Sequence, residues 1–158
     1  MATEQSPSPL FLCPSFEATV YPRGKRHLIF VEIMRNPDPG DVERISTILL
    51  AWARNTTHRF AMHWKHSDRI AHDVDPPDLK ALMTIVGTLL QHRDVLERRL
   101  AAVCMQGRVV DDLVVASKNL FLQLYQPKMS FDVVACDADA TAFLDEALAK
   151  RTPTHEEE

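Results

Sequence analysis

The start of the chain carries two hydrophobic patterns that together predict a β-hairpin. Residues 16–21 exchange apolar and polar side chains with a period of two, which predicts a half-exposed strand. Residues 27–34 form a nearly continuous apolar run, as expected of a strand covered on both faces. The turn signal PRGK at residues 22–25 separates them. A short turn between two such runs indicates antiparallel pairing.

After the hairpin, helical and strand-like periods alternate to the end of the chain. Apolar residues recur at helical spacing after four start signals, which contain Asp38, Asp78, Asp111 and Asp137. All but the second of these aspartates are interpreted as N-caps, because a carboxylate there accepts hydrogen bonds from unpaired backbone N–H groups. The second helix is expected to reach Leu90, and to continue toward Leu100 unless residues 92–94 interrupt it. Strand-like runs occupy residues 59–66, 101–105 and 131–135.

This alternation predicts the fold class. The element order β-β-α-β-α-β-α-β-α indicates a single α/β domain over residues 15–150, with a mixed, mostly parallel five-stranded sheet and about four helices. The Ser/Pro-rich residues 1–14 and the acidic residues 151–158 are expected to be disordered tails. The apolar residues 10–12 are the exception, because they suit docking on the domain or on a partner.

The composition of the chain limits the kinds of partner and the cellular compartment that we expect. The chain has 158 residues, 46% hydrophobic and 25% charged, which suits one core without a metal or a disulfide. A net charge of −4 argues against nucleic acid, and no apolar run approaches the length of a membrane span. No secretory signal is apparent. The three cysteines, an odd number without regular spacing, suit a soluble protein in a reducing cytoplasmic or other intracellular compartment.

Two segments resemble the STAS family (sulphate transporter and anti-sigma factor antagonist domains) and related lipid-carrier-like domains. They are the hairpin VYPRGKRHLIFV at residues 20–31 and the ending FDVVACDADATAFL at residues 131–144. With the element order, the resemblance covers residues 16–150 and implies an interaction or regulatory module. It also implies a phosphorylated hydroxyl after the third strand, for which Ser67 is the candidate. The matching stretch here is KHSDR, with no glycine after the serine.

No catalytic or cofactor motif stands out in the sequence. It contains no Gly-rich phosphate loop and no Gly-x-Ser-x-Gly nucleophile elbow, so no catalytic residue and no cofactor is expected. Histidines are dense between residues 58 and 72, but His63 and His66 project to opposite faces of a strand, so no metal site is assigned. Ligands of open α/β sheets gather beyond the carboxyl ends of parallel strands. The candidate ligand residues at that rim are His66, Asp68, His72 and Asp73.

Two functions follow as hypotheses. The first is a non-enzymatic STAS-like interaction or regulatory module, which binds a protein partner or forms a homodimer. The expected surface is an exposed edge strand at residues 16–21, or the end of the third strand with the adjoining helix. The alternative is a small-molecule or lipid carrier, or an unrecognised enzyme, with its ligand at the rim.

Overall fold

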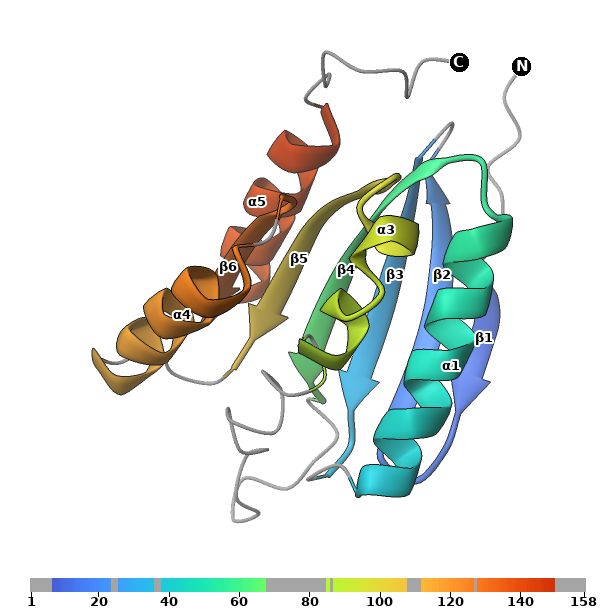
Figure 1. Cartoon of the computed structure of the whole chain (residues 1–158), viewed down its shortest axis with the longest axis horizontal. Helices are drawn as coiled ribbons and strands as arrows, with labels where there is room; N and C mark the ends of the chain where they lie inside the picture. Colours follow the sequence, from blue (N-terminus) through green and yellow to red (C-terminus); the bar gives the residue numbers. More distant parts are fainter. Residues whose placement is uncertain are drawn as a thin grey trace.

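A six-stranded mixed sheet forms the centre of the molecule (Figure 1). The computed structural model describes residues 7–23, 26–35, 38–67, 85, 87–107, 112–126 and 128–149. The strands lie side by side in chain order: β1 (Ser8–Leu12), β2 (Phe16–Arg23), β3 (Arg26–Ile33), β4 (Arg59–His66), β5 (Leu100–Gln106) and β6 (Ser130–Val134). Strand β2 runs antiparallel to its neighbours β1 and β3, and β3 to β6 are parallel. A single mixed, mostly parallel α/β domain is therefore confirmed.

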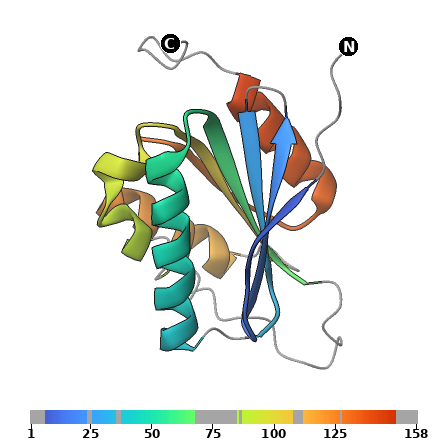
Figure 2. The same cartoon turned by 90° about the vertical axis from the view of Figure 1, so that its right-hand side faces the viewer.

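Helices cover the two faces of the sheet unequally. On one face lie α1 (Pro39–Asn55), α3 (Arg93–Leu96) and α4 (Asp112–Tyr125), and the opposite face carries α5 (Asp137–Ala149), as Figure 2 shows. Aromatic contacts join the first group of helices to the sheet. The ring centroids of Trp52 of α1 and Phe60 lie 4.9 Å apart, and those of Phe121 of α4 and Phe131 lie 4.7 Å apart. No helix among the described residues is long and apolar enough to cross a membrane.

Helix α1 begins as its sequence predicts. The Asp38 side chain accepts a 3.0 Å hydrogen bond from the backbone N–H of Asp41, and Pro39 occupies the first helical position. Ile45 and Leu49 project from the helix into the core. The cap interpretation of Asp38 is confirmed, whereas Asp111 lies outside the described residues.

The strand count differs from the expected five because the N-terminal segment contributes β1. This strand falls within residues 1–14, which the sequence analysis placed outside the domain, and it pairs antiparallel with β2. An irregularity between Pro9 and Phe11 interrupts the register, and Leu10 and Phe11 pack against the core. The segment was predicted to be a disordered tail because only its residues 10–12 are apolar and the rest is rich in serine and proline. It forms a strand nevertheless, because an edge strand tolerates proline.

The extra strand also moves the edges of the sheet. The prediction that residues 16–21 form an edge strand is wrong, because β2 is paired on both sides, with β1 and with β3. The edge strands are β1 and β6. A partner that extends the sheet would therefore have to pair with one of those two strands.

The helix expected toward Leu100 is interrupted. Residues 85 and 87–90 are helical in the described part, turns follow, and α3 begins at Arg93. Leu100 is the first residue of β5, so it belongs to the sheet. Residues 78–84 and 86 lie outside the described residues.

Candidate functional site

The carboxyl end of β4 holds two residues predicted for function, His66 and Ser67. His66 is buried and pairs in register with Ile33 of β3. Ser67 is also buried, and its backbone N–H donates a 3.0 Å hydrogen bond to the carbonyl of Ile33. The other rim candidates, Asp68, His72 and Asp73, lie outside the described residues, so their convergence with His66 stays a prediction.

The surroundings of Ser67 bear on its predicted phosphorylation. Its hydroxyl donates a 2.9 Å hydrogen bond to Glu32 Oε2. A phosphoryl group on that oxygen would meet the Glu32 carboxylate, and the two negative charges would repel. Phosphorylation of Ser67 would therefore require this end of the strand to open, and it stays a prediction.

No metal site is formed by the described residues. Nowhere among them do three or more histidine, cysteine or acidic side chains gather in an arrangement that could hold an ion.

Four polar side chains form a chain of hydrogen bonds where β4 and β5 meet the start of α5. Asp137 Oδ1 accepts from Lys65 Nζ at 2.8 Å and from Gln106 Nε2 at 2.9 Å. Gln106 Oε1 lies 2.7 Å from His63 Nε2. Because the ionised Asp137 carboxylate can only accept, it fixes the amide of Gln106 with its oxygen toward His63. His63 Nε2 therefore carries the hydrogen and donates it.

The electrostatics of this chain favour a neutral His63 and an ionised Asp137. Burial is the main cause that lowers the pKa of His63, and Lys65 acts in the same direction, while the hydrogen bond to Gln106 and the charge of Asp137 oppose them. The hydrogen bonds from Lys65 and Gln106 lower the pKa of Asp137. The neutral His63 ring then has its hydrogen on Nε2 and a lone pair on Nδ1.

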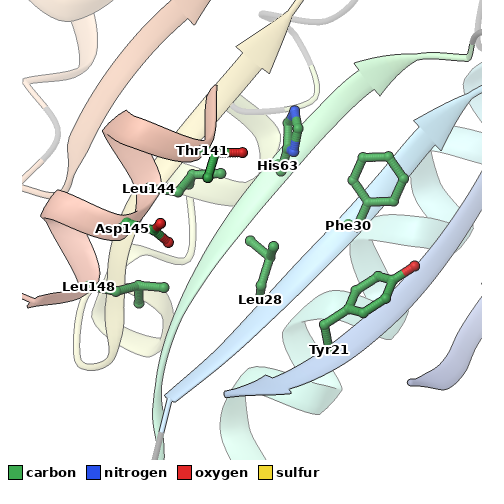
Figure 3. A pocket seen from close by; sticks show the side chains of 8 residues that line it. All are labelled: Tyr21, Leu28, Phe30, His63, Thr141, Leu144, Asp145 and Leu148. Carbon is green, nitrogen blue, oxygen red and sulfur yellow. The ribbon is translucent and has the colours of Figure 1, made fainter. Parts of the chain in front are cut away.

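A groove opens beside α5 on the face of the sheet that this helix covers only partly. Helix α5 packs over the small side chains of Ala61, Ala102 and Cys104 on β4 and β5. Beyond the helix, β2 and β3 carry large side chains that stand up from the same face. The groove between them, of about 200 Å³, is lined by Tyr21, Leu28, Phe30, His63, Thr141, Leu144, Asp145 and Leu148. We call it the α5 groove (Figure 3).

The α5 groove has two unlike walls. Figure 3 shows Thr141, Leu144, Asp145 and Leu148 projecting from the helix toward the sheet, with Leu28 between the walls and Tyr21 and Phe30 opposite. His63 stands at one end, and its ring centroid lies 5.1 Å from that of Phe30. The groove is therefore mostly apolar, with one imidazole and one carboxylate.

This site was not predicted from the sequence, although part of its signal is present there. From the sequence, His63 was a candidate only for metal binding. It shares a strand face with Lys65, and the parallel register places Lys65 beside Gln106. Asp137 was interpreted as a cap, whereas its Oδ1 accepts hydrogen bonds from Lys65 and Gln106. Only the register of β4 against β5 and the position of the start of α5 bring these residues together.

A different kind of feature lies on the outer side of α4. We call it the α4 stripe: the exposed apolar side chains of Leu120 and Leu124. Val115 and Tyr125 are also exposed, but Val115 projects about half a turn away from Leu124, and the Tyr125 ring centroid lies 5.0 Å from that of buried Phe121. Leu120 and Leu124 are 55% and 68% exposed, and they lie one helical turn apart. The helix carries two charged residues, Asp112 and Lys118, and Lys118 is paired with Asp132 of β6 at 3.1 Å.

Comparison with known proteins adds no relative: no protein-family model, no curated protein and no solved structure matches this chain. The resemblance to STAS domains therefore stays a prediction.

Proposed function

We propose that this protein is a non-enzymatic, STAS-like interaction module that associates with a second copy of itself through the α4 stripe. One observation carries the proposal. Leu120 and Leu124, which are 55% and 68% exposed, lie next to each other on one side of α4, whereas the exposed Leu12 on β1 stands by itself among the described residues. Exposed apolar side chains that gather in one place mark interaction surfaces, whereas scattered single ones need no explanation.

The charge of α4 favours a second copy as the partner. A homodimer with twofold symmetry buries the same patch on both chains, so that patch must be compatible with itself. The α4 helix has one acidic and one basic residue and no net charge, although the whole chain has a net charge of −4. Two copies can therefore bring their α4 helices together without the repulsion that two acidic surfaces would produce.

The place of α4 in the fold suits this role. The helix packs on β6, which is an edge strand of the sheet (Figure 1). A copy that docks along α4 would lie close to β6 and would shield an edge that is otherwise open to pairing. The Lys118–Asp132 ion pair holds helix and strand together, so they would form one continuous surface.

A reducing, intracellular setting belongs to the same proposal. Cys13, Cys104 and Cys136 are all free thiols. Unpaired cysteines are typical of compartments in which disulfides do not persist.

Sedimentation equilibrium of the purified protein tests the proposal. The unmodified chain is expected to form a dimer. Leu120→Lys and Leu124→Lys are each expected to weaken it about 10- to 100-fold, because each removes a leucine side chain that the dimer would bury. The matched control is Leu12→Lys, which replaces a leucine that is 75% exposed on the opposite edge of the sheet. That variant is expected to dimerise like the unmodified protein.

Two results would contradict this function. A monomer at all accessible concentrations would exclude self-association. A dimer that Leu12→Lys disrupts, and that both α4 variants leave intact, would place the interface on the β1 edge instead.

A further inference from the structure

We propose that the α5 groove binds a small compound with one aromatic or heteroaromatic ring that donates a hydrogen bond to His63 Nδ1. The groove lies on the opposite face of the sheet from α4. The inference is therefore independent of the proposed self-association, and either can fail without the other.

The size of the α5 groove sets the size of its ligand. A cavity of about 150 Å³ lined by apolar side chains is large enough for benzene. The α5 groove measures about 200 Å³, which suits one ring with one or two substituent atoms. Drug-sized ligands occupy sites of about 300–1,000 Å³, so a larger compound would extend out of the groove.

The side chains that form the sheet wall favour a ring. Tyr21, Phe30 and His63 follow one another on adjacent strands, with centroid separations of 6.3 Å and 5.1 Å and both pairs in edge-to-face geometry. Leu144 and Leu148 face them from α5 (Figure 3). A flat apolar ring between these walls would contact leucine on one side and aromatic rings on the other. Aromatic pairs in such arrangements are stabilised beyond their area burial.

The hydrogen bond expected of the ligand follows from the tautomer of His63. In the described part of the chain, the His63 ring makes one hydrogen bond, from Nε2 to Gln106 Oε1. Gln106 cannot turn its amide around without losing the bond to Asp137. Nδ1 therefore presents a lone pair, and a ligand must bring an O–H or N–H group to it.

The lone pair of His63 Nδ1 also disfavours one class of ligand. A carboxylate offers only acceptor oxygens, so it cannot donate a hydrogen bond to Nδ1 and its negative charge would face the imidazole lone pair.

NMR titration of the full chain with four one-ring probes tests the inference: phenol, benzylamine, toluene and benzoate. Phenol and benzylamine are expected to shift signals of His63, Phe30 and Leu144, with dissociation constants on the order of 1–10 mM for ligands of this size. Toluene, which lacks a donor, is expected to bind about five- to tenfold more weakly than phenol, the equivalent of one hydrogen bond. Benzoate is expected to leave these signals unshifted.

The unmodified protein also supplies a direct readout of the hydrogen bond. The ¹⁵N signal of His63 Nδ1 is expected to move toward the value of a hydrogen-bonded acceptor when phenol is added, and to stay in place with toluene. This measurement needs no substitution at His63, whose buried ring also supports the fold.

The inference is overturned if no probe shifts the groove signals, if toluene binds as tightly as phenol, or if benzoate binds as tightly as either.

Discussion

The Ser15 hydroxyl donates a 2.6 Å hydrogen bond to Asp41 Oδ2, and this bond joins the turn between β1 and β2 to the first turn of α1. Both side chains are fully buried although they lie 26 residues apart in the chain. Arg44 also donates to the Asp41 carboxylate, and Arg35 donates to the Ser15 oxygen at 3.2 Å. The cluster holds the N-terminal hairpin against the helix that follows β3.

Replacing Ser15 by alanine is expected to destabilise the protein by about 2 kcal/mol, because a buried hydrogen bond to a charged group is lost and no water can replace it. Urea unfolding at neutral pH measures the change. The matched control is Ser46→Ala, on α1. The Ser46 hydroxyl is buried and has no hydrogen-bond partner among the described residues, so its removal is expected to leave stability unchanged or to raise it. Equal losses from both substitutions would contradict the role of the Ser15–Asp41 bond.

The Ser15→Ala penalty is expected to depend on pH. The hydrogen bond from Ser15 is the largest cause that lowers the pKa of Asp41, from 3.8 to about 2, and Arg44 contributes in the same direction while burial opposes. A carboxyl whose pKa is lower in the folded state stabilises the fold fully above its unfolded pKa, and loses that contribution as the pH falls through the folded value. The difference in stability between the two proteins should therefore be constant above about pH 5 and shrink between about pH 4 and 2. A difference that stays constant down to pH 2 would show that Ser15 does not act through the ionised Asp41.

Substitutions at Gln106 are expected to move the pKa of His63 in opposite directions. In Gln106→Glu a carboxylate replaces the amide oxygen next to Nε2, which favours the imidazolium and should raise the pKa. In Gln106→Met the acceptor is lost, and with it a hydrogen bond that raises the pKa, so the value should fall further below the ordinary one. NMR titration of the His63 ring signals measures both. Identical titrations in all three proteins would mean that His63 Nε2 does not bond to residue 106.

Sequence periodicity was sufficient to predict the helices and strands whose apolar residues repeat over many positions. The β2–β3 hairpin, the parallel order of β3 to β6 and the Asp38 cap of α1 all follow from local patterns. The α5 groove does not, because it depends on α5 returning over the face opposite to the other helices. The pattern of a helix shows which of its sides is buried, but it does not show which face of the sheet the helix will cover.

The same limit applies to residues that meet only through the tertiary structure. Nothing near Ser15 in sequence predicts its contact with Asp41, and Lys65, Gln106 and Asp137 come together only through the strand register and the start of α5. For β1, the Ser/Pro-rich composition of the segment led to the prediction of a disordered tail. The prediction was wrong because a short edge strand needs few apolar residues to pack on a sheet that already exists.

Deleting residues 1–12 tests the contribution of β1. The deletion removes the packing of Leu10 and Phe11 on the core and leaves β2 with an unpaired edge eight residues long. We expect a loss of roughly 2 kcal/mol in the free energy of unfolding, as for two partly buried apolar side chains. We also expect new self-association, because an uncovered edge strand pairs with other chains. Deleting residues 1–6, which retains β1, is the control and should change neither property. The new association should persist when Leu120→Lys is added, because it uses the β2 edge and not α4. If the chain without residues 1–12 is as stable as the full chain, β1 contributes nothing to the stability of the sheet.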